Sequence, residues 1–122
     1  CCFLIYRLPK RVAQITDNIE SMLQLARANG IRVVLLSVLP ASRYYWNPAQ
    51  RPGPRIVALN ASLKALAART GDLYVDLHTP MADAEAGLPK AWSDDGVHPN
   101  RAGYERMRPL VQQAITQALL PR

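Results

Sequence analysis

Apolar side chains recur at intervals of three and four residues in three long segments, residues 11–29, 54–70 and 100–120. This spacing places them on one face of a helix, so three amphipathic helices are predicted. Gly30 and Gly71 end the first two, because a glycine just past the last turn readily adopts the left-handed cap conformation. In the third segment the predicted apolar face consists of Tyr104, Met107, Val111, Ile115, Ala118 and Leu119.

Short apolar runs between these segments predict strands. The clearest covers residues 31–39, and its continuous Val and Leu content is typical of a parallel strand covered on both faces. Residues 1–6 and 73–77 form two further runs of strand length, and a short helix is expected over residues 79–85. This alternation of strands and helices predicts an α/β domain with a parallel sheet and right-handed crossovers.

Composition narrows the class of protein. The chain has 122 residues, of which 49% are hydrophobic and 20% charged, and this fits one globular domain. Its longest apolar run, residues 33–39, is too short to span a membrane. The net charge of +6 comes from scattered arginines without a nucleic-acid-binding motif, so we interpret it as surface charge and expect no nucleic-acid partner. Two adjacent cysteines form no disulfide framework, so the compartment is not defined.

Candidate chemistry concentrates in residues 93–104, which read Ser-Asp-Asp-Gly-Val-His-Pro-Asn-Arg-Ala-Gly-Tyr. Asp95 and His98 lie three residues apart, and the glycine between them permits a tight turn. Pro99 ends the turn, and Asn100 is a good cap for the helix that follows. Such a turn brings the carboxylate toward Nδ1 of the ring, which fixes the tautomer and leaves Nε2 to accept a proton. A segment between the last strand and the last helix lies at the carboxyl edge of a parallel sheet, where ligands bind.

The chain resembles the SGNH/GDSL hydrolase family of serine esterases and lipases. The resemblance is carried by Asp94-Asp95-Gly96-Val97-His98-Pro99-Asn100 and Ala102-Gly103-Tyr104, and is supported by Ala28-Asn29-Gly30 and Tyr74-Val75-Asp76-Leu77. It implies a three-layer, flavodoxin-like fold in which helices flank a parallel sheet. It also implies that Asp95 and His98 belong to a Ser-His-Asp triad that hydrolyses a small ester without metal or cofactor. His98 would be the general base toward the serine and then the general acid toward the leaving alkoxide.

The resemblance also implies blocks that the chain does not contain. The family's nucleophile lies in a Gly-Asp-Ser-Leu-like block near its N-terminus, and neither this block nor a Gly-x-Asn-Asp block is present. Residues 1–12 do not resemble the family. We therefore interpret residues 1–122 as a single domain that corresponds to the C-terminal part of the family domain and is incomplete at the N-terminus, a pattern that a truncated or frame-shifted reading would produce.

Other residues offer weaker alternatives. Ser37, Ser42 and Ser93 lie near a strand end or near the histidine, but none occupies a nucleophile-elbow motif. Asp76 and His78 alone are too few ligands for a metal site. The loop of residues 41–53 carries aromatic side chains that either line an acyl or alcohol pocket or cover the core, namely Tyr44, Tyr45 and Trp46.

The sequence thus predicts the C-terminal part of a GDSL-like lipase or acylhydrolase that carries Asp95 and His98 but no evident nucleophilic serine. We expect the chain alone to be inactive as an enzyme. The alternative is a non-catalytic α/β fragment or binding module that self-associates through an exposed sheet edge.

Overall fold

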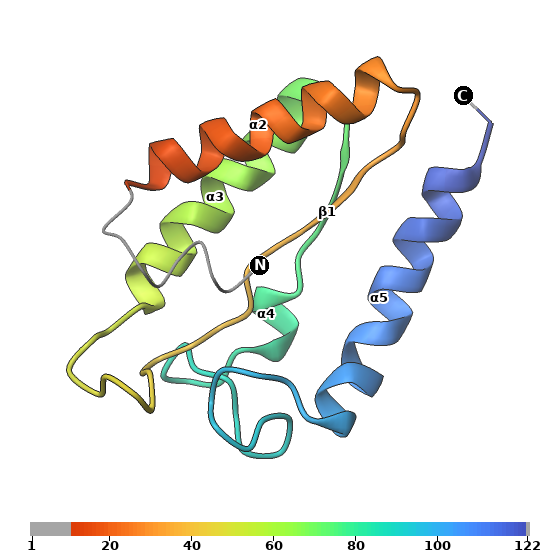
Figure 1. Ribbon diagram of the computed structural model, residues 1–122. Helices are drawn as coiled ribbons and strands as arrows, with labels where there is room; N and C mark the ends of the chain where they lie inside the picture. The colour runs from red at the N-terminus through yellow and green to blue at the C-terminus, as the bar shows by residue number, and fades with distance from the viewer. Residues whose placement is uncertain (1–10, 122) are drawn as a thin grey trace.

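The structure is a computed structural model that describes residues 11–121. Along the chain it contains α2 (Val12–Ala28), β1 (Val34–Leu36), α3 (Gly53–Thr70), β2 (Leu73–Val75), α4 (His78–Met81) and α5 (Arg101–Leu119). Figure 1 shows α2 and α3 side by side on one side of the strands and α5 on the other. The predicted strand over residues 1–6 lies outside the described residues. Within residues 11–121, no helix is long and apolar enough to cross a membrane.

The two strands form a parallel pair, as predicted. Val34 lies opposite Leu73, and Leu36 lies opposite Val75. Both strands are shorter than their apolar runs, because polar side chains bind the backbone where the ladder stops. Asn60 of α3 accepts the N–H of Val38 at 2.7 Å and donates to its C=O at 2.9 Å.

Ser37, directly after β1, ends the ladder on the side of β2. The backbone N–H of Ser37 still donates to the C=O of Val75 at 3.0 Å. Its hydroxyl oxygen then accepts the N–H groups of Leu77 and His78, at 2.9 and 3.0 Å. A buried side chain therefore replaces the next strand partner, and the chain turns into α4 instead of continuing as a strand. The predicted helix over residues 79–85 is this shorter element.

The helix α5 packs on the strands through a face that differs in part from the predicted one. Its contacts with Val34, Val75 and Leu77 come from Met107, Leu110, Val111 and Ala114. Tyr104, Ile115 and Leu119, which the apolar spacing placed on the packed face, are exposed. Among the described residues, only one narrow stripe of α5 meets the two strands, and this stripe runs through Leu110 and Ala114.

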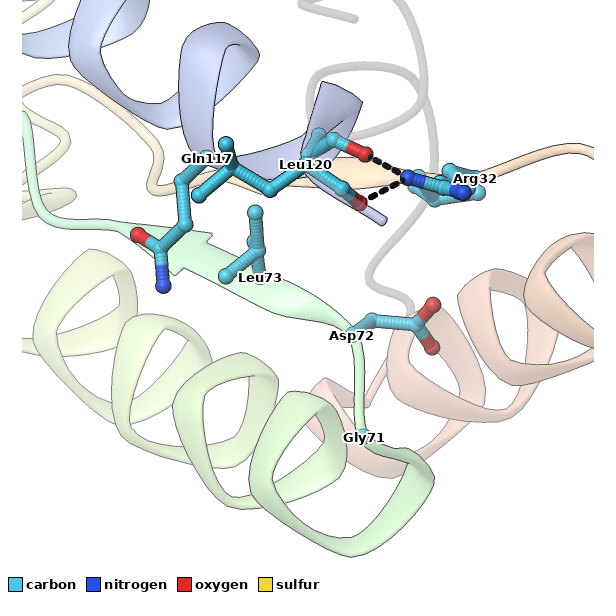
Figure 2. Close-up of a pocket in the computed structure, with 8 residues that line it drawn as sticks. Arg32, Gly71, Asp72, Leu73, Gln117 and Leu120 are labelled. Carbon is cyan, nitrogen blue, oxygen red and sulfur yellow. Dashed lines mark hydrogen bonds between the residues drawn. The ribbon is translucent and has the colours of Figure 1, made fainter. Parts of the chain in front are cut away.

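Arg32 connects the far end of α5 to the start of β1. Its Nη1 donates to the C=O groups of Ala118 and Leu120, the latter at 2.7 Å, as Figure 2 shows. A cation at these carbonyls also offsets the partial negative charge at a helix C-terminus. The small pocket drawn there, of about 140 Å³, lies at the amino ends of the strands. The strands run away from it, toward the end of the molecule that holds the loop between α4 and α5 (Figure 1).

Candidate active site

A tight loop, residues 93–99, carries both predicted site residues. Ser93 and Pro99 form an isolated antiparallel bridge that closes the loop. Gly96, at its middle, has a φ of +78°, in the left-handed region that glycine adopts without steric cost. The loop leaves the carboxyl end of the sheet and leads directly into α5, so its position agrees with the predicted edge.

The Asp95 carboxylate binds both the ring and the backbone of the residues that follow it. Its Oδ2 lies 2.7 Å from Nδ1 of His98. Its Oδ1 accepts the backbone N–H groups of Val97 and His98, each at 2.8 Å. An ionised carboxylate can only accept hydrogen bonds, so we assign the ring proton to Nδ1. In the neutral ring, Nε2 is then the nitrogen that accepts a proton.

These contacts also set the ionisation of Asp95. Burial of the carboxylate opposes ionisation, but hydrogen bonds from the backbone N–H and ring of His98, and from the N–H of Val97, outweigh that effect. Together with the charge of the ring, they hold the pKa of Asp95 well below its ordinary value of 3.8. The carboxylate is therefore ionised across the pH range in which histidine ordinarily titrates.

The pair is open to solvent on the side of the ring. The His98 side chain is 57% exposed and the Asp95 side chain 33% exposed. Within the part of the chain that the structure describes, Nε2 of His98 makes no hydrogen bond. A proton donor from outside these residues can therefore approach Nε2 while Nδ1 stays bound to the carboxylate.

The buried hydroxyl of Ser93 binds two backbone groups of the loop. Ser93 is 1% exposed, and its Oγ accepts the N–H of Gly96 at 2.9 Å and donates to the C=O of His98 at 2.7 Å. Asp95 Oδ1 lies 3.2 Å away, but a hydroxyl has one proton to donate, and the shorter contact uses it. Because this hydroxyl is buried and fully engaged, Ser93 is not available as a nucleophile.

The first turn of α5 fixes the other end of the loop. Asn100 caps the helix by accepting the N–H of Gly103 at 3.0 Å, and its own N–H donates to the C=O of Trp92 at 2.8 Å. A Cβ added to Gly103 would lie 2.5 Å from the same Trp92 oxygen. Only glycine permits this approach, so the glycine of the Ala-Gly-Tyr motif is required at position 103 for steric reasons.

Val97 attaches the loop to the core. It is 6% exposed and packs with Ala41, Tyr44 and Ile56, from the loop after β1 and the first turns of α3. Its side chain and the Asp95 bond to its N–H therefore anchor the same residue from two directions. The position of the His98 ring follows from this anchoring and not from the ring's own packing.

The remaining candidate serines differ in their surroundings. Ser37 is 6% exposed and serves as the backbone acceptor described above, so its role is structural. Ser42 is half-buried and lies against Gly87, where a Cβ would come within 2.7 Å of the Ser42 hydroxyl. Within the described residues, neither serine makes a hydrogen bond with His98.

Asp76 and His78 do not form a metal site in the described residues. Asp76 accepts the N–H and the hydroxyl of Thr79, at 3.0 and 2.5 Å, and these bonds outweigh its burial and lower its pKa. Nε2 of His78 is buried without a hydrogen-bond partner within residues 11–121. No group of three His, Cys, Asp or Glu side chains gathers in this part of the chain.

The aromatic loop divides between core and surface. Tyr44 is buried, and its ring stacks on Trp46 with centroids 4.8 Å apart. Tyr45 meets the edge of Trp46 at 4.7 Å, and both of these side chains are exposed. Tyr44 therefore covers the core beneath Val97, which is the second of the two roles that the sequence left open.

The chain combines a parallel α/β arrangement with an oriented, solvent-accessible imidazole at the carboxyl end of its strands. This is the class of fold and site in which hydrolytic proton transfer is often found. Residues 6–106 match the model of the GDSL-like lipase/acylhydrolase family, and the chain belongs to that family. The predicted family and the α/β fold are thus confirmed.

Solved structures agree with this assignment. A GDSL-like lipase from Bacteroides thetaiotaomicron superposes with a TM-score of 0.85 at 37% identity, over 91% of this chain and 55% of that one. A candidate acylhydrolase from Bacteroides fragilis gives the same TM-score at 40% identity, over 90% of this chain and 54% of that one. A GDSL lipase from Mycobacterium tuberculosis is 29% identical over 113 residues, which are 92% of this chain and 46% of the relative. The chain therefore spans about half the length of these relatives.

Proposed function

We propose that this chain supplies the acid–base half of a serine ester hydrolase, with Asp95 and His98 as two members of a Ser-His-Asp triad. The observation that carries the proposal is the 2.7 Å contact between Asp95 Oδ2 and His98 Nδ1, which leaves Nε2 exposed. Family membership supports the reaction class, and the fixed loop around the pair supports the roles of the two residues.

In the proposed reaction, Nε2 of His98 takes the proton of a serine hydroxyl as the serine oxygen attacks the acyl carbon of the ester. Asp95 holds the ring in the required tautomer and stabilises the imidazolium that forms. His98 then gives the proton to the departing alkoxide, which leaves an acyl-enzyme, and a water molecule repeats the sequence to release the acid. Each step moves one proton through Nε2, and the proposal assigns no metal or cofactor.

The serine belongs, in this proposal, to the half of the family domain that these residues do not span. That half would also contribute the oxyanion donors and further parallel strands, which would complete a three-layer domain around the β1–β2 pair. One such donor typically contributes about 100-fold to 1000-fold in rate. The chain alone is therefore expected to hydrolyse 4-nitrophenyl acetate hardly faster than free imidazole does.

The test joins the chain to the N-terminal half of a GDSL domain that carries the Gly-Asp-Ser and Gly-x-Asn-Asp blocks. The joined protein is expected to turn over the ester, His98→Ala to abolish turnover, and Asp95→Asn to lower it by a factor on the order of 10⁴. Asp94→Asn is the matched control, because the neighbouring carboxylate is exposed and makes no hydrogen bond within the described residues.

Two results would overturn the proposal. One is undiminished turnover by the joined protein after His98→Ala. The other is stoichiometric labelling of a serine by a fluorophosphonate in the chain alone, with ester turnover that disappears when that serine is replaced. A joined protein that folds but never turns over any ester would favour the non-catalytic alternative.

A further inference from the structure

An open pocket of about 630 Å³ lies at the same end of the molecule as the Asp95–His98 pair. Its walls come from the loop after β1, the first turns of α3 and the loop after α4. Arg43 and Arg51 provide charged groups, and Pro54, Val57 and Ala86 provide apolar surface. The pocket is therefore suited to an apolar ligand segment that ends in a charged group.

One wall of the pocket is rigidly built. Asp83 Oδ1 accepts the N–H groups of Glu85 and Gly87, each at 2.9 Å, while the backbone N–H of Asp83 donates to the C=O of Gly87 at 2.9 Å. These bonds hold Ala86 at a φ of +57°, a conformation that costs a residue with a Cβ about 1–2 kcal/mol. Strain of this kind persists only where the surroundings fix the backbone, and it is frequent at ligand sites.

The two sides of the pocket are in close contact between Ser42 and Gly87. A Cβ on Gly87 would lie 2.7 Å from Ser42 Oγ, so the loop after α4 and the loop after β1 are in direct contact there. The pocket thus has fixed edges before any ligand arrives, and binding to it need not order either loop.

The pocket and the candidate active site share one small core. Val97, next to the histidine, packs on Ala41, Tyr44 and Ile56. Ser42 and Arg43 of the pocket wall lie between the first two of these residues in sequence. Ile56 lies in sequence between two further wall residues, Pro54 and Val57. A ligand in the pocket therefore lies against the segments that support the His98 loop.

The charges of the pocket favour a ligand with one negative charge. Arg43 forms no ion pair or hydrogen bond with any described residue. Arg51 donates from Nη1 to the C=O of Pro48 at 2.6 Å, which orients its guanidinium and leaves its other N–H groups for a ligand. Glu85 is the acidic residue of the wall, so two cations face one anion. The net charge of the wall matches a single carboxylate better than a doubly charged group.

We propose that this pocket is a specificity subsite, and that Arg43 and Arg51 select esters whose acyl or alcohol part ends in a carboxylate. The proposal rests on the ester hydrolase function proposed above. The apolar wall would contact the methylene segment of such a monoester, and the two arginines would bind its free carboxylate. The ester carbonyl would then extend out of the pocket toward the exposed Nε2 of His98.

The test measures binding to the chain itself, by titrating ¹⁵N-labelled protein with monomethyl glutarate and with the neutral dimethyl glutarate. We expect saturable shifts at Arg43 and Ala86 with the monoester and clearly weaker binding of the diester. Arg43→Met and Arg51→Met should each weaken monoester binding by about threefold to fivefold, the range of a partly exposed ion pair. Arg69→Met is the control, since Arg69 does not line the pocket and instead forms an ion pair with Glu20 of α2 at 2.9 Å.

A variant that is expected to tighten binding distinguishes the proposed charge effect from a loss of folding. Glu85→Gln removes the acidic group of the wall and should tighten binding of the monoester. Equal binding of the two esters, no saturable binding of the monoester, or full retention of binding in the Arg43→Met/Arg51→Met double variant would overturn the proposal. Saturable binding of the monoester without turnover by the joined protein would contradict the hydrolase function and leave the proposal of an anion-binding pocket intact.

Discussion

The loop that carries the candidate active site depends on one buried hydroxyl, and Ser93→Ala removes it. The substitution leaves the N–H of Gly96 without its acceptor at 2.9 Å and the C=O of His98 without its donor at 2.7 Å. A buried group that loses its partner costs about 1–3 kcal/mol, but water can reach part of this loop and replace some of the loss. We therefore expect Ser93→Ala to lower the free energy of unfolding by about 2 kcal/mol.

The assay is equilibrium urea unfolding, followed by circular dichroism. With a slope of about 2 kcal/mol/M, the expected loss moves the midpoint by about 1 M. Ser62→Ala is the matched control, because Ser62 lies in α3 and its hydroxyl makes no hydrogen bond within the described residues. It should change the free energy of unfolding by less than about 0.5 kcal/mol. Equal midpoints for the two variants would refute the argument that the Ser93 hydroxyl holds the loop.

Three further substitutions test the surroundings of the site. Gly103→Ala should destabilise the chain by about 1–3 kcal/mol in the same urea assay, because its Cβ would lie 2.5 Å from the Trp92 carbonyl oxygen. Asn60→Ala should cost about 2–4 kcal/mol, since it leaves both backbone groups of Val38 unpaired, and hydrogen exchange at Val38 should rise. The pKa of Asp95 is lower in the folded than in the unfolded chain, so its stabilising effect is complete above about pH 5 and disappears as the pH falls through the folded value. Acid titration of Asp95→Asn should accordingly show a smaller loss of stability below pH 4 than the parent chain does, and equal losses would contradict the contact.

The helices were predictable because apolar spacing and glycine caps are local signals, and the parallel strand pair was predictable from the alternating order of strands and helices. Apolar spacing and the Gly30 and Gly71 caps place the ends of α2 and α3 within about a residue of the observed ones. The strand lengths were not predictable in the same way. The ladder stops where Asn60 and Ser37 bind the backbone, and each of these contacts joins residues that are far apart in sequence.

The packed face of α5 also depends on distant residues. Apolar spacing alone cannot decide between Leu110 and Ile115, because both fit a helical stripe and only the position of the strands selects one of them. Apolar side chains of α5 that do not meet the strands are exposed on the described surface, Ile115 and Leu119 among them.

The contact between Asp95 and His98 was predictable from the sequence, but the structure of the loop that carries them was not. Asp95, Gly96 and His98 have a spacing that permits only a few turn geometries, and the observed contact is among them. Ser93 was considered as a nucleophile, although a serine three residues before a glycine and two before an aspartate is also a turn-forming pattern. That pattern indicates the structural role that Ser93 has in the loop.

The most direct test of the central claim is the tautomer of His98 in the chain itself. Ring ¹⁵N shifts, measured at mildly alkaline pH where imidazole is ordinarily neutral, distinguish a proton on Nδ1 from one on Nε2. If Asp95 orients the ring for base catalysis, the Nδ1–H form should predominate, and Asp95→Asn should shift the ring toward the Nε2–H form while Asp94→Asn leaves it unchanged. A predominant Nε2–H tautomer in the parent chain, or the same tautomer mixture in Asp95→Asn, would contradict the account.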